Sequence, residues 1–136
     1  MSRDLAIPTP IWDEMVAHIA AEAPREACGL LGGKDNRVIV HYSIENEAHS
    51  TTRFSMQPQQ QLQAFLSLDE QGLDLVAIYH SHPAGAAYPS ETDLSEHAYP
   101  GVAHVILSPQ GVRWHGGAFL LDHHEVERLS LRVVDA

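Results

Sequence analysis

Two histidines separated by one residue mark the part of the sequence where chemistry is expected. His80 and His82 stand at the end of an apolar run and are followed directly by Pro83. In an extended strand, residues two apart point to the same face, so the two imidazoles would lie side by side. This spacing is typical of a pair of metal ligands.

A carboxylate follows the histidine pair at a useful distance. Pro83 and Gly85 predict an irregular loop that can return the chain, so that Asp93, in the first turn of the next helix, supplies a third ligand. Two neutral imidazoles and one carboxylate suit Zn²⁺, and three protein ligands leave the fourth tetrahedral position to water. We therefore predict one catalytic zinc ion per chain, held by His80, His82 and Asp93.

Ser90 has two interpretations. A serine with an acidic residue three positions later is a signature of a helix N-terminus, in which the hydroxyl caps the first turn. The same hydroxyl could instead donate a hydrogen bond to the oxyanion that forms on an attacked carbonyl. A serine can cap a helix and still face the metal, so the two roles are compatible.

The elements that must position these residues indicate an α/β sandwich with a mixed sheet and few helices. The apolar run 74–80 predicts a strand that is covered on both faces and lies near the centre of the sheet. Residues 34–36 predict a hairpin-like turn, and the glycines Gly32 and Gly33 are expected to end the strand before it. The expected helices cover residues 11–19, 58–69 and 90–99. The expected strands cover residues 27–32, 37–44, 74–80, 102–107, 112–121 and 126–134.

Length and charge exclude several classes of protein. A chain of 136 residues predicts one domain, residues 1–136. The net charge of −10 argues against binding to nucleic acid or to an anionic membrane surface. No apolar run approaches the roughly 18 residues that a membrane span needs. The single cysteine, Cys28, cannot form an internal disulfide and is interpreted as a core residue, which favours a cytoplasmic protein.

The histidine segment resembles the zinc-binding motif of the JAMM (MPN-plus) metalloprotease family. Four residues match the positions of that motif: His80, His82, Ser90 and Asp93. The segment 24–32 is similar to the family's N-terminal glutamate segment, and this similarity implies that Glu26 is the general base. The resemblance covers most of the chain and implies a mixed curved β-sheet flanked by helices, the JAMM/MPN (cytidine-deaminase-like) core.

The resemblance also implies an activity. It is hydrolysis of an amide or isopeptide bond after the C-terminal tail, commonly Gly-Gly, of a ubiquitin-like or sulfur-carrier protein, by glutamate-assisted attack of zinc-bound water. Two alternatives stay open: a non-catalytic MPN-type binding or assembly module, and a hydrolase of small amides. A homodimer is compatible with the sequence, although no exposed apolar stripe argues for one.

Other residues near the motif have weaker signals. Glu22 competes with Glu26 as a base. His97 lies four residues after Asp93 and could touch the site, but we interpret it as a surface residue. Arg53 precedes the second helix at an expected strand edge and could meet a substrate, although an ordinary strand is the favoured interpretation.

Overall fold

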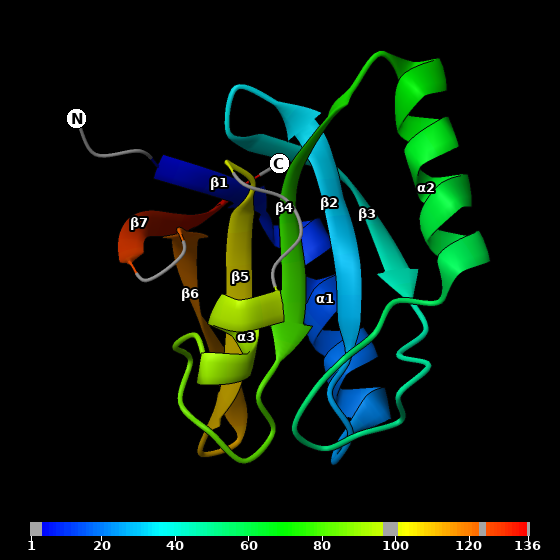
Figure 1. Cartoon of the computed structure of the whole chain (residues 1–136). Coiled ribbons are helices and arrows are strands. Elements are labelled where there is room, and N and C mark those ends of the chain that lie inside the picture. Colours follow the sequence, from blue (N-terminus) through cyan, green and yellow to red (C-terminus); the bar gives the residue numbers. More distant parts are fainter. Residues whose placement is uncertain (1–3, 97–100, 123–124, 136) are drawn as a thin grey trace.

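The computed structural model describes residues 4–96, 101–122 and 125–135 (Figure 1). Within these ranges the strands follow the order β1-β3-β2-β4-β5-β6-β7, and the sheet closes on itself because β1 pairs with both β3 and β7. The strands are β1 (Asp4–Pro8), β2 (Cys28–Lys34), β3 (Arg37–Ile44), β4 (Asp74–Ser81), β5 (Ala103–Gln110), β6 (Arg113–Leu121) and β7 (Val126–Val134).

Helices cover the sheet on different sides. Helix α1 (Thr9–Glu22) lies behind the strands in the view of Figure 1, and α2 (Pro58–Gln71) flanks β2 and β3 at the right. The short helix α3 (Glu91–Glu96) crosses in front of β4 and β5. Gly72 ends α2 in the left-handed conformation, with φ of 67°.

Strand β4 separates two parts of the core. Ala77 and Tyr79 belong to the cluster that packs against α1, whereas Ile78 belongs to the cluster under α2. The strand lies between β2, which is antiparallel to it, and β5, which is parallel to it. The predicted mixed sheet, with the apolar run 74–80 near its centre, is therefore confirmed.

Two details differ from the sequence-based expectation. Strand β2 does not end at Gly32 and Gly33 but continues to Lys34. Its register shifts at these glycines, and a Cβ on Gly32 would meet the side chain of Leu68 from α2. Strand β1 was not predicted, because five residues bounded by a proline carry too little periodicity.

The turn between β2 and β3 has the expected form. Asp35 and Asn36 both have positive φ, 51° and 63°, and Lys34 pairs with Arg37. A two-residue hairpin with this backbone is favoured by the right-handed twist of its strands.

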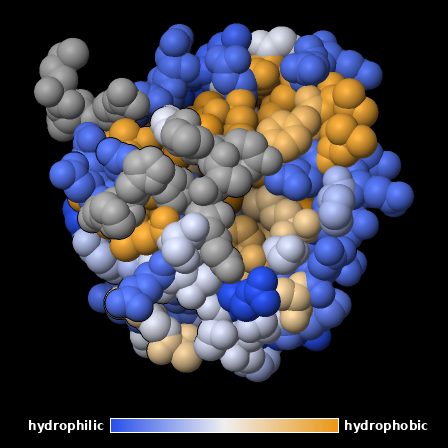
Figure 2. Space-filling model, viewed as in Figure 1, coloured by the Kyte–Doolittle hydropathy of each residue, from blue (hydrophilic) through white to orange (hydrophobic). Residues whose placement is uncertain are grey.

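The surface of α2 is partly apolar. Leu62 is 58% exposed and Leu66 is 53% exposed, and Figure 2 shows apolar side chains gathered over this side of the molecule. Among the described residues, no helix has the length and apolar character needed to cross a membrane.

Candidate metal centre

The three predicted ligands form a triangle of polar atoms. The Nε2 atoms of His80 and His82 lie 3.1 Å apart. The carboxylate of Asp93 reaches both rings, with Oδ1 at 3.2 Å from His80 Nε2 and Oδ2 at 3.1 Å from His82 Nε2. The two rings and the carboxylate thus point at one small volume.

Glu26 lies beside this triangle. Its carboxylate and the ring nitrogens of His80 and His82 all lie within 4.8 Å of one another, and the residue is 3% exposed. Within the described part of the chain, Glu26 Oε1 and His80 Nδ1 are buried without a hydrogen-bond partner. Only one proton can lie between the two facing ring nitrogens of neutral imidazoles, so these buried groups cannot all be satisfied by hydrogen bonds to one another. A cation between them would be bound by their lone pairs.

The backbone selects the tautomer of one ring. His82 Nδ1 lies 2.9 Å from the carbonyl oxygen of Ala86, which can only accept a hydrogen bond. The Nδ1 atom must therefore carry a proton, so that whenever the ring is neutral its Nε2 atom has a lone pair with which to bind a cation. Metal-binding histidines are commonly oriented in this way.

The charges of the cluster are strongly coupled. Burial alone raises the pKa of Asp93, but hydrogen bonds from His80 and His82 outweigh burial and hold this pKa well below its usual range. Burial lowers the pKa of His80, which keeps its ring neutral. For His82 the hydrogen bonds to Asp93 and Ala86 outweigh burial, and its pKa is raised. Burial raises the pKa of Glu26 to about 7.

Ser81, between the two histidines, ties their strand to the segment that carries Glu26. The Ser81 N–H donates to the carbonyl of Ala27 at 3.0 Å, and the Ala27 N–H donates to the Ser81 hydroxyl at 2.8 Å. On the other side, the His82 N–H donates to the carbonyl of Leu107 in β5 at 2.8 Å. The site therefore spans the ends of neighbouring strands that the backbone holds in register.

Ser90 caps α3, as one of its two interpretations expected. The Asp93 N–H donates to Ser90 Oγ at 3.1 Å, and the Ser90 N–H donates to Asp93 Oδ2 at 2.8 Å. This is a reciprocal capping box. Because the cap uses the serine oxygen as an acceptor, the hydroxyl proton stays available for a second role.

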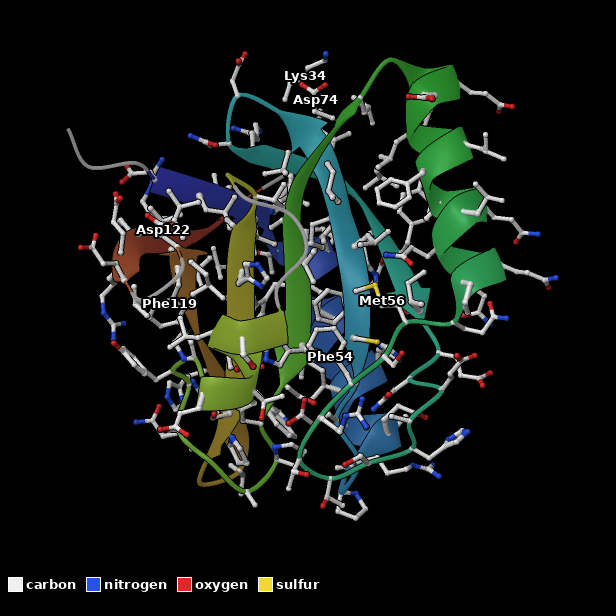
Figure 3. All side chains as sticks on the ribbon, viewed as in Figure 1. Lys34, Phe54, Met56, Asp74, Phe119 and Asp122 are labelled. Carbon is white, nitrogen blue, oxygen red and sulfur yellow. The ribbon has the colours of Figure 1, made fainter. Side chains whose placement is uncertain are left out.

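The segment between β3 and α2 adds a contact to the site that the sequence did not predict. The ring of Phe54 stacks on the ring of His80, with centroids 4.6 Å apart and planes inclined by 29°. Figure 3 shows Phe54 and Met56 over β2 and β4. Residues 53–55 are not in a strand, so the ordinary strand interpretation of Arg53 was wrong. The 45–57 segment has no periodic pattern that could have shown this packing.

The remaining candidates fall outside the cluster or outside the described residues. Glu22 ends α1 and is not among the residues grouped with the two histidines. Cys28 is fully buried, and burial raises the pKa of its thiol to about 12, which agrees with a core role. His97 lies outside the described residues.

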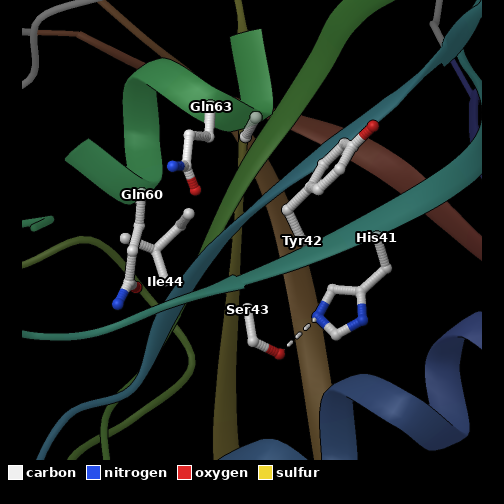
Figure 4. A pocket seen from close by; sticks show the side chains of 7 residues that line it. His41, Tyr42, Ser43, Ile44, Gln60 and Gln63 are labelled. Carbon is white, nitrogen blue, oxygen red and sulfur yellow. Dashed lines mark hydrogen bonds between the residues drawn. The ribbon is translucent and has the colours of Figure 1, made fainter. Parts of the chain in front are cut away.

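A separate pocket of about 410 Å³ is lined by residues of β3 and α2. Figure 4 shows Gln60 and Gln63 of α2 on one side of the strand and His41 and Ser43 on the other. None of the metal-centre residues lines this pocket.

The chain is similar to known proteins over most of its length. Residues 8–117 match the model of the prokaryotic homologs of the JAB domain. The chain is 39% identical over 119 residues to a probable TtuB-protein conjugate cleaving protease of Thermus thermophilus, covering 86% of this chain and 76% of that protein. It is 32% identical over 133 residues to the CysO-cysteine peptidase of Mycobacterium tuberculosis, covering 96% and 84%.

A solved structure shows the same fold. The JAB1/MPN domain protein from Archaeoglobus fulgidus superposes with a TM-score of 0.62 at 20% identity, covering 96% of this chain and 98% of that one. The fold and the similarity to named peptidases define an enzyme of the peptidase class. The chain belongs to the family of prokaryotic JAB-domain proteins, which confirms the resemblance found in the sequence.

Proposed function

We propose that this chain is a zinc-dependent peptidase that cleaves the amide or isopeptide bond after the C-terminal tail of a ubiquitin-like or sulfur-carrier protein. The observation that carries the proposal is the convergence of His80, His82 and Asp93 within 3.2 Å, with the buried Glu26 carboxylate beside them. We further propose that residues 1–136 act as one peptidase domain.

The ligands are assigned as His80, His82 and Asp93, with Glu26 as the base. Asp93 contacts the inward nitrogens of both rings directly, as a carboxylate sharing a cation with two imidazoles would. Glu26 also lies near the rings, and in the metal-free protein burial raises its pKa to about 7. A carboxylate with a pKa near neutrality is suited to accepting and returning a proton.

Bound zinc supplies Lewis acidity, which makes water a better nucleophile and polarises a carbonyl. Glu26 then accepts a proton from the attacking water on a carboxylate oxygen and passes it to the nitrogen of the leaving amine. The proton therefore moves from one reactant to the other through a single side chain. Glu26 is almost fully buried, which limits the exchange of this proton with bulk water.

Ser90 is proposed to act on the substrate as a hydrogen-bond donor. Its oxygen is engaged by the Asp93 N–H, so its hydroxyl proton can be directed at the oxygen of the attacked carbonyl. The capping box fixes this hydroxyl close to Asp93 without making the serine a nucleophile.

The names of the two curated relatives support the substrate class. One is a probable TtuB-protein conjugate cleaving protease and the other is a CysO-cysteine peptidase, so both names describe a peptidase that cleaves a bond to a named component. A flexible tail of small residues would enter the buried centre with little steric conflict, which favours Gly-Gly next to the scissile bond.

The test compares substrates and a base variant. The zinc-loaded protein is incubated with a ubiquitin-like carrier joined through Gly-Gly to a second protein, and with small N-acyl amino acids. We expect cleavage of the carrier conjugate only, and loss of cleavage in Glu26→Gln with zinc still bound. Cleavage of the small amides alone would favour an amide hydrolase, and binding of the carrier without cleavage would favour a binding module.

A further inference from the structure

The side chain of Asn46 connects the segment that carries Glu26 to the segment that carries Phe54. Asn46 is 4% exposed. Its Nδ2 group donates to the carbonyl of Glu26 at 2.9 Å and to the carbonyl of Arg53 at 3.1 Å. Its Oδ1 atom accepts from the N–H of Ala48 at 3.1 Å and from the N–H of Ser55 at 2.9 Å.

These four hydrogen bonds use the whole capacity of one amide, which has two donor hydrogens and two acceptor lone pairs. Two of them lie on either side of Phe54, at Arg53 and Ser55. Asn46 therefore holds the main chain on both sides of Phe54. The ring of Phe54 stacks on the ring of His80.

The main chain of Glu26 depends on the same segment. Its carbonyl accepts from Asn46, and its N–H donates to the carbonyl of Ser50 at 2.8 Å. Glu26 precedes β2, so no strand partner holds these two groups. Glu26 Oε1 has no hydrogen-bond partner among the described residues, so the two main-chain hydrogen bonds contribute directly to where this residue lies.

From these contacts we infer that Asn46 is a positioning residue for the reaction. It holds Glu26 and Phe54 in fixed relation to His80 without touching substrate or metal. This inference deepens the proposed function and rests on it. A displacement of a reacting group by about 1 Å can cost on the order of 100-fold in rate, so release of the Glu26 backbone is expected to lower kcat.

Two variants of Asn46 remove different sets of these four hydrogen bonds. Asn46→Asp keeps the oxygen that accepts from Ala48 and Ser55 but replaces the group that donates to Glu26 and Arg53. Asn46→Ala removes all four bonds. Gln60→Ala is the matched control, because Gln60 Oε1 accepts from the Glu45 N–H at 2.7 Å and so anchors the same segment without contacting Glu26.

Kinetics on a carrier protein ending in Gly-Gly-aminocoumarin provide the main readout. We expect both Asn46 variants to lose about 10- to 100-fold in kcat with KM and zinc content close to wild type, and Gln60→Ala to keep kcat. A kcat within twofold of wild type in Asn46→Asp, or a rise in KM at unchanged kcat, would overturn the inference. Failure of the wild-type protein to cleave the carrier would instead overturn the proposed function.

A second measurement uses the unmodified, metal-free protein and does not depend on activity or on the folding of a variant. If Asn46 joins the two segments, the amide protons of Glu26 and Ser55 exchange with solvent through one opening, with equal dependence on denaturant. Two openings of different denaturant dependence would show that the segments move independently and would overturn the inference.

Discussion

Tyr79 and His80 are neighbours in β4 and serve opposite faces of the sheet. The Tyr79 hydroxyl lies 2.7 Å from His18 Nδ1 and 2.7 Å from His41 Nε2, on the side of α1. The His80 ring faces Asp93 on the other side. The alternation of a strand thus places two histidine-rich clusters back to back, and only one of them contains a grouped set of metal ligands among the described residues.

Removal of one ligand should abolish metal binding. His82→Ala deletes one nitrogen of the triangle, and we expect zinc to fall from about one per chain to near zero. Elemental analysis of the purified, zinc-supplied protein measures this. His115→Ala is the matched control, because His115 is exposed on β6; a variant at position 82 that keeps its zinc would contradict the ligand assignment.

The raised pKa of Glu26 predicts a pH-dependent stability of the metal-free protein. The folded state holds the Glu26 proton up to a pH of about 7, whereas the ordinary value is 4.5. The stability that this proton contributes is complete below pH 4.5 and is lost as the pH rises through about 7. Glu26→Gln cannot ionise, so its free energy of unfolding relative to wild type should rise by about 2 kcal/mol from pH 5 to pH 8.

Urea unfolding in the presence of a chelator, at pH 5 and at pH 8, measures this difference. Glu22→Gln is the control, because Glu22 lies outside the cluster. If the unfolding free energies of Glu26→Gln and wild type differ by the same amount at both pH values, folding does not raise the pKa of Glu26 and the prediction is wrong.

The Tyr79 hydroxyl is expected to contribute to stability and not to metal binding. Tyr79→Phe leaves the nitrogens of His18 and His41 without their shared partner, and we expect a loss of about 1 to 2 kcal/mol in unfolding free energy. Zinc content should not change. Tyr88→Phe, at an exposed position, should stay within about 0.5 kcal/mol of wild type; denaturant titrations compare the two, and equal values would refute the prediction.

Gly29 is expected to tolerate no side chain. A Cβ at this position would meet the ring of Tyr79 and the carbonyl oxygen of Tyr42. Gly29→Ala should therefore lower the unfolding free energy by about 3 kcal/mol. Gly85→Ala, where the nearest atom is His82 Cβ at 3.7 Å, should unfold like wild type. Thermal unfolding of both variants measures the contrast, and a stable Gly29→Ala would contradict the packing.

The sequence predicted those parts of the molecule that have a local pattern. The spacing of His80, His82 and Asp93 follows from strand alternation and a helix start, and residues 75–79 form an apolar run because the strand is covered on both faces. Phe54 and Asn46 could not be found in this way. Their roles depend on contacts with His80 and Glu26, which lie 26 and 20 residues away along the chain, and no periodicity records such contacts.

The capping box also limits how variants at position 93 can be interpreted. Asp93 Oδ2 accepts from the Ser90 N–H and lies against His82 Nε2, so one atom serves both the first turn of α3 and the ligand triangle. An inactive Asp93 variant therefore combines two lesions that a single assay cannot separate. Zinc content and unfolding free energy, measured separately on the same Asp93 variant, distinguish the two: the first reports on the ligand triangle and the second on the capped turn of α3.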